Sequence, residues 1–330
     1  AIVKLSALGD IVHAMVVLQF IKKFNTEISI DWFVEDDYKE LLEFHPDINK
    51  VHLLNLRKAK KKKSLFVLIE ELNRLRKLSP YDAVIDMQGL IKSAIIARLI
   101  PSKITLGFDK NSIRESLASR FYSHKIQVEY SENIVIRNLI LISTSLENSI
   151  IKSNVINKKP FLFSNVKYFL KDELKIKRRV ALIPGASFKS KCYPIKKYAK
   201  FVNEVDANFF VIWGNQNEKI MANELKSLSQ HVEIIDKLSI DELISFISQM
   251  DLVVGSDTGP THMAWALNIP SITLFGPTPG NRNSFETETN KYIESKSKVN
   301  ALKIDKSDNS IKDINVEDIV KIARNLLKAI

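Results

Sequence analysis

Residues 257–262, Asp-Thr-Gly-Pro-Thr-His, have the composition of an anion-binding site at the start of a helix. They follow a short apolar run at 252–254. Proline suits the first turn of a helix, and the backbone N–H groups of Thr258 and Gly259 would lie at the positive end of the helix dipole. Such a turn binds phosphate groups. The carboxylate of Asp257 would repel phosphate, so we expect it to accept hydrogen bonds from sugar hydroxyls.

A second loop with candidate catalytic chemistry lies near the N-terminus, at residues 6–10, Ser-Ala-Leu-Gly-Asp. Asp10 can cap the helix that begins near Ile11. A carboxylate at the end of a strand can also act as a general base on an acceptor hydroxyl. The local sequence leaves both interpretations open, and His13, one turn further on, could assist the base or simply pack.

Two more strand ends carry polar chemistry. Gly185, Ala186 and Ser187 are small enough to let a phosphate approach the backbone, and the ammonium group of Lys191 could neutralise charge that develops on a diphosphate leaving group. Glu218 follows another strand and could accept hydrogen bonds from ribose hydroxyls, although a carboxylate in the first turn of a helix is equally natural.

The strands and helices that hold these loops can be predicted from the sequence. Short β-branched runs alternate with longer amphipathic runs, which is the pattern of βα units around a parallel sheet. The predicted strands are 1–5, 28–34, 83–86 and 103–107 in the first half, and 179–183, 209–213, 232–235, 252–254 and 271–275 in the second. Helices are expected at 11–24, 65–77 and 316–330, a linker at about 145–159, and a surface excursion at about 287–310. Open sheets bind ligands beyond the carboxyl ends of their strands, where all four loops lie.

Composition limits the function classes. A chain of 330 residues, 45% of them hydrophobic, favours two domains and excludes a disordered or fibrous protein. The single cysteine, Cys192, fits a reducing compartment, and no CxxC, HExxH or Asp-x-Asp pattern offers a metal site. The absence of GxGxxG and GxxxxGK[ST] disfavours a dinucleotide oxidoreductase and a P-loop kinase. Without a leader or an apolar stretch of about 18 residues, we expect a cytoplasmic protein.

The formal net charge of +11 attracts polyanions, and it is partly concentrated in the basic run at 57–63. Such a run is most often a solvated loop. Charge alone leaves open a protein that binds polyanions without catalysis, but that alternative does not explain the residues at the strand ends.

Five motifs together resemble a family, the ADP-heptose:lipopolysaccharide heptosyltransferases of glycosyltransferase family 9, and within it most closely the heptosyltransferase I branch. The resemblance runs from Val3 to about Pro279. The alternative within the family is the heptosyltransferase II branch, which uses the same donor and a heptose acceptor. The motifs are residues 6–10, residues 86–90 with Lys92-Ser93, Gly107-Phe108-Asp109 with Ile113-Arg114-Glu115, residues 185–187, and residues 257–262.

The resemblance implies an α/β protein with the GT-B fold, in which two Rossmann-like domains face each other across a cleft and the last helix packs back on the first domain. Residues 1–155 would bind the acceptor, 156–312 would bind ADP-heptose, and 313–330 would form the returning helix. The implied reaction transfers L-glycero-D-manno-heptose from ADP-heptose to Kdo of Kdo-lipid A, with inversion and without a metal or other cofactor. The protein would work peripherally at the inner face of the cytoplasmic membrane and would not bind nucleic acid.

The resemblance also implies residue roles. Asp10 would be the catalytic base, and Lys191 would stabilise the departing ADP. The other implied donor contacts are Ala186 and Ser187 at the phosphates, Glu218 at the ribose, Leu238 at the adenine, and Asp257, Thr258, Gly259 and His262 at the sugar and diphosphate. The implied acceptor contacts are Arg114 and, in the basic run, Arg57, Lys58, Lys60 and Lys61.

Overall fold

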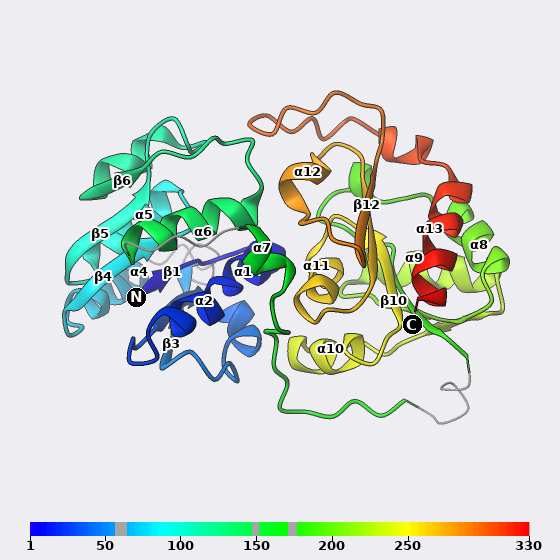
Figure 1. The fold of residues 1–330 in the computed structure, drawn as a ribbon, viewed down its shortest axis with the longest axis horizontal. Coiled ribbons are helices and arrows are strands. Elements are labelled where there is room, and N and C mark those ends of the chain that lie inside the picture. The colour runs from blue at the N-terminus through cyan, green and yellow to red at the C-terminus, as the bar shows by residue number, and fades with distance from the viewer. Residues whose placement is uncertain (57–64, 147–151, 171–176, 330) are drawn as a thin grey trace. The chain divides into compact units, whose positions relative to one another are not determined.

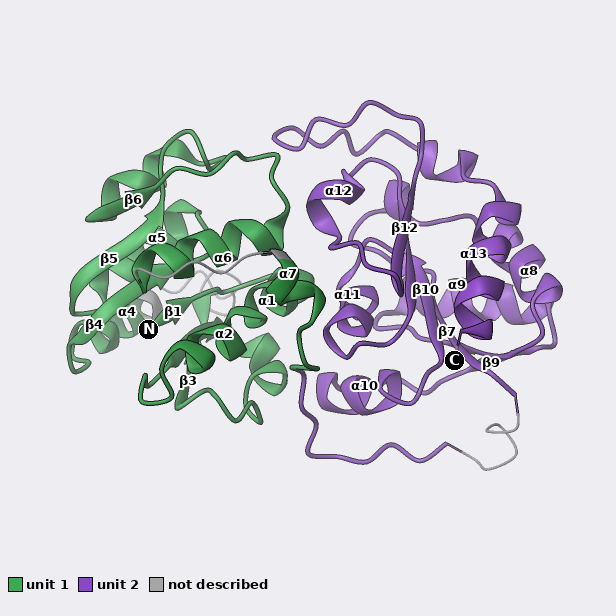
Figure 2. Ribbon diagram, viewed as in Figure 1, with its two compact units in different colours: residues 1–161 green, residues 162–330 purple. Residues whose placement is uncertain are grey.

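The chain forms two compact units, residues Ala1–Phe161 and Leu162–Ile330 (Figure 2). The computed structural model describes residues 1–56, 65–146, 152–170 and 177–329. The boundary between the units falls a few residues after the boundary predicted between 155 and 156. Each unit is described below by itself.

Unit 1 is an α/β domain whose strands are all parallel (Figure 1). Among the described residues its sheet has six strands in the order β3-β2-β1-β4-β5-β6. The strands are β1 (Ile2–Val3), β2 (Asp31–Glu35), β3 (Lys50–Leu54), β4 (Tyr81–Asp86), β5 (Ser102–Phe108) and β6 (His124–Ile126). The helices are α1 (Leu8–Met15), α2 (Val17–Phe24), α4 (Leu65–Arg76), α5 (Ile91–Leu99), α6 (Ile134–Ser145) and α7 (Lys152–Ile156).

Unit 2 repeats this plan. Its described strands form one parallel sheet of six in the order β12-β11-β10-β7-β8-β9. The strands are β7 (Arg179–Ile183), β8 (Asn208–Val211), β9 (Val232–Ile234), β10 (Leu252–Ser256), β11 (Ser271–Phe275) and β12 (Asn290–Glu294). The helices are α8 (Ile195–Glu204), α9 (Gln216–Leu228), α10 (Ile240–Ile247), α11 (Gly259–Ala266), α12 (Gly280–Asn283) and α13 (Val316–Lys328).

Both sheets therefore have the strand order of a dinucleotide-binding Rossmann domain, in which the direction of the strand order reverses beside the first strand. The reversal lies between β1 and β4 in unit 1 and between β7 and β10 in unit 2. At such a point the loops after the two strands diverge to opposite faces of the sheet and leave a crevice between them. The predicted α/β class with parallel sheets is confirmed, and the reversal shows which loops can form a site.

Helices cover both faces of each sheet. In unit 1, α5 contacts α4, β1 and β4, while α6 contacts α1, α2 and β5. In unit 2, α8, α9 and α13 share one core with the strands, and α10 and α11 pack together with α11 lying on β10 and β11. Apolar side chains from consecutive elements are thus buried on both sides of each sheet, as a doubly wound fold requires.

The last helix, α13, belongs to unit 2. Its buried stripe is part of the same core as α8, β10 and β11, and the helix contacts all three of these elements. That the helix also packs back on the first domain stays a prediction. Helical periodicity shows that a helix has an apolar face, but it does not show which surface that face covers. The buried residues of the stripe are Val316, Ile319, Val320, Ala323, Leu326 and Leu327.

Three strands were not predicted, namely β3, β6 and β12, and β12 lies inside the stretch expected to be a surface excursion. All three are outermost among the described strands, and each pairs with a neighbour on one side only. They contain exposed or half-buried polar residues. Such strands lack the continuous apolar run that marks a strand buried on both faces. The single helix expected at 11–24 is two helices, α1 and α2, joined at Val16.

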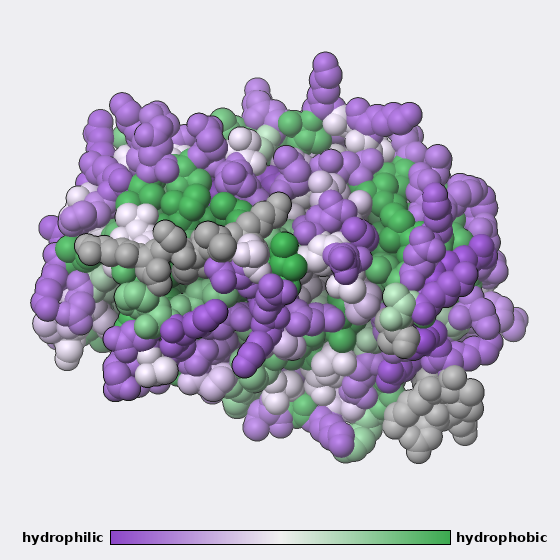
Figure 3. Space-filling view, in the orientation of Figure 1, coloured by the Kyte–Doolittle hydropathy of each residue, from purple (hydrophilic) through white to green (hydrophobic). Residues whose placement is uncertain are grey.

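Hydrophilic residues predominate on the face drawn in Figure 3. The most exposed of the large apolar side chains among the described residues are Phe66 and Phe169, which are 77% and 78% exposed. Within the described residues, no helix has the length and apolar character needed to cross a membrane.

Candidate active site

The two loops at the strand reversal of unit 2 meet through an ion pair. Strands β7 and β10 are hydrogen-bonded neighbours, so the loops that follow them start side by side. The loop after β7 carries Lys191 and the loop after β10 carries Asp257. The Lys191 Nζ lies 2.7 Å from Asp257 Oδ2, and the two side chains are 11% and 10% exposed. The fold thus joins two candidate residues that are far apart in the sequence.

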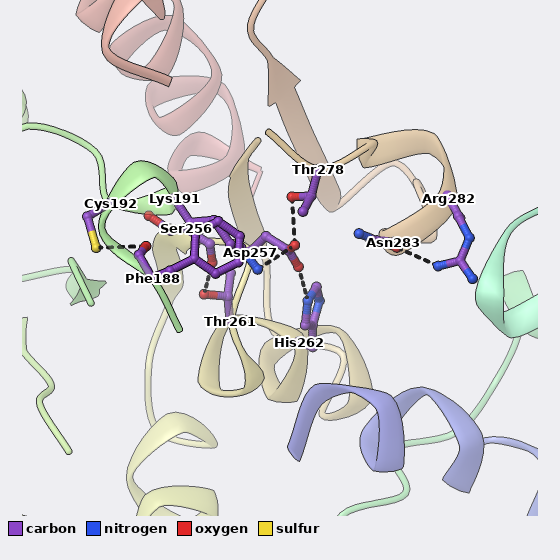
Figure 4. Close-up of polar contacts among 10 residues, drawn as sticks. All are labelled: Phe188, Lys191, Cys192, Ser256, Asp257, Thr261, His262, Thr278, Arg282 and Asn283. Atoms are coloured by element: carbon purple, nitrogen blue, oxygen red, sulfur yellow. Dashed lines mark hydrogen bonds and ion pairs between the residues drawn. The ribbon is translucent and has the colours of Figure 1, made fainter. Parts of the chain in front are cut away.

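Asp257 is the centre of this cluster, as Figure 4 shows. His262 Nε2 lies 3.0 Å from Asp257 Oδ1, and the Thr278 hydroxyl donates to Asp257 Oδ2 at 2.8 Å. Burial alone would raise the pKa of the Asp257 carboxyl. The nearby Lys191 ammonium and the contacts with His262 outweigh burial and hold that pKa well below its usual range. Asp257 is therefore a buried carboxylate at neutral pH.

The start of α11 has the form expected of an anion site. Thr258 precedes the helix with extended backbone, Pro260 occupies its first turn, and the Thr261 hydroxyl donates to the Ser256 carbonyl at 2.9 Å. Among the hydrogen bonds of the described residues, the N–H groups of Thr258 and Gly259 have no acceptor. These donors lie at the positive end of the helix dipole, so they can bind a phosphate oxygen.

Glu218 lies beside the same loops. Its Oε2 accepts a hydrogen bond from the Gly214 N–H at 2.6 Å. A Cβ atom added to Gly185 would lie 2.4 Å from the Glu218 Cδ, so only glycine at 185 lets this carboxylate approach the loop after β7. Ala186 is half-buried and Ser187 is exposed in that loop. Leu238 is half-buried in the connection between β9 and α10.

In unit 1 the loop after β1 carries Asp10, which is exposed at the third position of α1. Asp10 Oδ2 accepts a hydrogen bond from the Ala7 N–H at 3.3 Å, so the carboxylate does act as a helix cap. The second oxygen of a carboxylate keeps its capacity to accept a proton. A cap and a general base are thus compatible roles. His13 is buried in α1, and Arg114 is exposed.

A hydrogen-bonded support lies under this loop, and it is built from residues of the motif at 86–90. Gln88 Oε1 accepts hydrogen bonds from the N–H groups of Leu5 and Ser6, at 3.1 and 3.2 Å. Gln88 follows β4, so it joins the two arms of the strand reversal in unit 1 as Lys191 and Asp257 do in unit 2. Gly89, with a φ of 69°, completes the turn in a conformation that favours glycine.

Asp86 fixes the turn that carries Gln88. The fully buried Asp86 carboxylate accepts from the Gln88 N–H at 2.8 Å, the Ser93 hydroxyl at 2.8 Å and the Tyr122 hydroxyl at 2.7 Å. Burial raises the pKa of Asp86, although these hydrogen bonds act in the opposite direction. Its partners identify Asp86 as a structural residue beneath the loop.

The structure thus brings together Lys191, Asp257 and His262, with Glu218 on the next strand end. It places Asp10 and Arg114 in unit 1.

Thr278 was missed, because a single threonine in the run Gly-Pro-Thr-Pro-Gly carries no chemical signal in the sequence. The predicted acceptor residues Arg57, Lys58, Lys60 and Lys61 lie outside the described residues. In the described part of the chain, no three His, Cys, Asp or Glu side chains gather as metal ligands would, and metal independence stays a prediction.

Comparison with known proteins identifies relatives along nearly the whole chain. The family model "Glycosyltransferase family 9 (heptosyltransferase)" matches residues 70–312. A lipopolysaccharide heptosyltransferase 1 from Campylobacter coli is 42% identical, with 99% of this chain and 98% of that protein covered. A protein of the same name from Salmonella typhimurium is 29% identical, with 84% of this chain and 89% of that protein covered.

Solved structures give the same picture of the fold. The Escherichia coli heptosyltransferase WaaC with ADP matches with a TM-score of 0.80 at 23% identity, over 98% of both chains. The same enzyme with ADP-2-deoxy-2-fluoro heptose has a TM-score of 0.77. Escherichia coli ADP-heptose LPS heptosyltransferase II matches with a TM-score of 0.68 at 16% identity, over 99% of this chain and 98% of that one. The GT-B fold predicted from the sequence is confirmed by these likenesses.

Proposed function

Because this chain belongs to glycosyltransferase family 9, the heptosyltransferases, we propose that it transfers heptose from ADP-heptose during lipopolysaccharide synthesis. In finer detail, we propose that L-glycero-D-manno-heptose passes to Kdo of Kdo-lipid A, with inversion at the anomeric carbon. The observation that carries the proposal is the Lys191–Asp257–His262 cluster beside the open start of α11.

The cluster fits a sugar diphosphate. The N–H groups of Thr258 and Gly259 would receive phosphate oxygens, where the helix dipole favours negative charge. Asp257 and His262 would meet sugar hydroxyls. Glu218 would accept from the ribose, and the half-buried Leu238 side chain would contact the base. The structures of Escherichia coli WaaC with ADP and with an ADP-heptose analogue support a donor of this kind.

The reaction proposed is a single displacement. The acceptor hydroxyl loses its proton to Asp10 as its oxygen forms a bond to the anomeric carbon. The bond between that carbon and the oxygen of the diphosphate breaks, and the electron pair leaves with ADP. The Lys191 ammonium and the start of α11 stabilise the negative charge that develops there, so the reaction needs no metal ion.

The acceptor side rests on charge. Kdo-lipid A carries carboxylates and phosphates, which suits Arg114 and the basic run at 57–63. A lipid-linked acceptor also places the reaction at an anionic membrane surface, to which basic segments are attracted. We therefore propose peripheral contact with the inner face of the cytoplasmic membrane.

The experiment that tests the reaction is mass-spectrometric detection of a heptose adduct when purified protein is given ADP-heptose and Kdo-lipid A. Heptose-terminated acceptor is offered separately, and transfer to that substrate alone would replace this proposal with the heptosyltransferase II activity. Failure with both acceptors, together with tight RNA binding, would indicate a polyanion-binding protein instead.

The role of Asp10 is tested by Asp10→Asn. We expect kcat to fall by about 10²- to 10⁴-fold, while the Kd for ADP stays unchanged, because the base acts only on the acceptor. Asp318→Asn is the matched control, since Asp318 is also exposed at the third position of a helix, α13. Near-normal turnover in Asp10→Asn would show that Asp10 is only a helix cap.

A further inference from the structure

The segment between β12 and α13 brings a second lysine to the donor loop. The Ser190 hydroxyl donates to the Lys306 carbonyl at 2.7 Å, which ties this segment to the loop after β7. The Lys306 Nζ lies 5.7 Å from the centroid of the Phe188 ring, and the Lys191 Nζ lies 5.5 Å from the same centroid. Two ammonium groups that are more than a hundred residues apart in sequence thus share one aromatic ring, at a distance typical of cation–π contacts.

The segment that carries Lys306 is held in place by its own polar groups. Asp308 accepts hydrogen bonds from the Ser297 hydroxyl at 2.7 Å and from the Ser310 N–H at 2.8 Å. Asp305 accepts from both the N–H and the hydroxyl of Ser307, at 2.8 and 2.6 Å. Both carboxylates therefore bind groups of their own loop, and among the described contacts neither forms an ion pair with Lys306.

The charge balance of the donor site shows why a second lysine matters. The charge of Lys191 is offset by Asp257 at 2.7 Å. The pair has no net charge, so its long-range attraction for a diphosphate is weak, although the Lys191 ammonium can still act at short range on the departing ADP. Lys306 is exposed, and no carboxylate of the described residues pairs with it. Its positive charge is therefore available to an incoming anion.

We propose that Lys306 is a further donor-binding residue, whose ammonium group binds the diphosphate of the nucleotide sugar while Lys191 stays paired with Asp257. The inference rests on the proposed function, since it takes the site after β7 and β10 to be the donor site. The Phe188 ring lies within cation–π distance of both ammonium groups, one from the loop after β7 and one from the segment after β12. The segment after β12 is thus part of the donor site.

The consequence is a preference for ligands with two phosphates. The energy of an electrostatic contact is proportional to the charge of the ligand and is screened by salt. Removing the charge at 306 therefore affects ADP more than AMP, and the effect shrinks as salt is added. Phe188 and the Ser190–Lys306 hydrogen bond involve no phosphate, so a purely structural role for Lys306 would affect both nucleotides equally.

The test is calorimetric titration of ADP and AMP into the full chain and into Lys306→Gln, Lys306→Arg and Lys303→Gln. Lys303 is the matched control, because it is an exposed lysine of the same segment. At low salt we expect Lys306→Gln to raise the Kd for ADP about tenfold, with a change of less than about threefold for AMP. Lys306→Arg should keep most of the ADP affinity, and Lys303→Gln should match the wild type.

Failure of the inference and failure of the proposed function are distinguishable. If the wild-type chain binds ADP and transfers heptose, but Lys306→Gln binds ADP as tightly as Lys303→Gln does, the inference about Lys306 is wrong and the proposed function stands. An equal loss of ADP and AMP affinity in Lys306→Gln would also overturn it. If the wild-type chain binds no ADP, the proposed donor falls and the inference falls with it.

Discussion

The ion pair between Lys191 and Asp257 allows a sharp prediction about stability. Replacing Lys191 with methionine keeps the bulk of the side chain but leaves the buried Asp257 carboxylate without its cation. His262 and Thr278 still bind the carboxylate, but hydrogen bonds from neutral groups do not cancel its negative charge. Breaking a buried pair in this way costs about 3–5 kcal/mol in the free energy of unfolding. We expect a loss near the lower end of that range, because each side chain is still about one-tenth exposed.

The double variant Lys191→Met/Asp257→Asn removes both charges together. Its free energy of unfolding should recover most of the loss, so the coupling energy of the double-mutant cycle should be about 2–3 kcal/mol. The exposed pair Lys177–Asp206 is the control, with an Nζ–Oδ1 distance of 2.6 Å but side chains that are 56% and 85% exposed. Its coupling energy should be below about 1 kcal/mol, because water screens an exposed pair.

Urea titration followed by tryptophan fluorescence gives these energies, since Trp213 and Trp265 both lie in unit 2 with the pair. The cycle is measured at pH 7, where Asp257 is ionised. A coupling energy as small as that of Lys177–Asp206 would refute the argument, because it would mean that water screens the Lys191–Asp257 contact. Heptose transfer should stay low in the double variant even though its stability returns, since both charges belong to the proposed donor site.

Two other predictions concern unit 1. Gln88→Ala should lower kcat by about 10- to 100-fold with an unchanged KM for the donor, because the N–H groups of Leu5 and Ser6 lose the acceptor that holds the loop of Asp10. Gln88→Glu keeps an accepting oxygen and should restore most of the turnover, and failure to do so would show that the amide itself is needed. Burial lowers the pKa of His45 to about 4, so its contribution to stability is complete above pH 6.5 and is lost as the pH falls from 6.5 to about 4. Unfolding measured across that range should show a loss of about 3 kcal/mol that His45→Gln largely lacks, and parallel profiles for the two proteins would contradict this assignment.

The central strands of both sheets could be predicted from the sequence. β7 and β11 have the predicted bounds, because buried β-branched runs in a parallel sheet are apolar from end to end. The outer strands β3 and β12 could not be recognised, since Lys50 and Glu294 are exposed and the runs are mixed. Pairing with a neighbouring strand, rather than residue type, makes these segments strands.

The candidate site was predictable where one short segment contains all of its chemistry, as at 257–262. The partners that come from elsewhere were not. Lys191 was predicted to stabilise the departing ADP, which stays a prediction. Its ion pair with Asp257 was not foreseen, because that contact depends on β7 and β10 being neighbours in the sheet. Thr278 and Lys306 enter the site from loops after β11 and β12, at distances along the chain that no motif spans.

The packing of α13 also bears on how chains of this kind could be recombined. The helix completes the core of unit 2 with residues from that unit, so every element of its sheet and both of its helix layers come from one continuous stretch after Phe161. A chimaera joined between Phe161 and Leu162 would exchange unit 1 without dividing either core. If unit 1 binds the acceptor and unit 2 binds the donor, as proposed, acceptor preference and donor preference would then be separable traits, each inherited from a single segment of the gene.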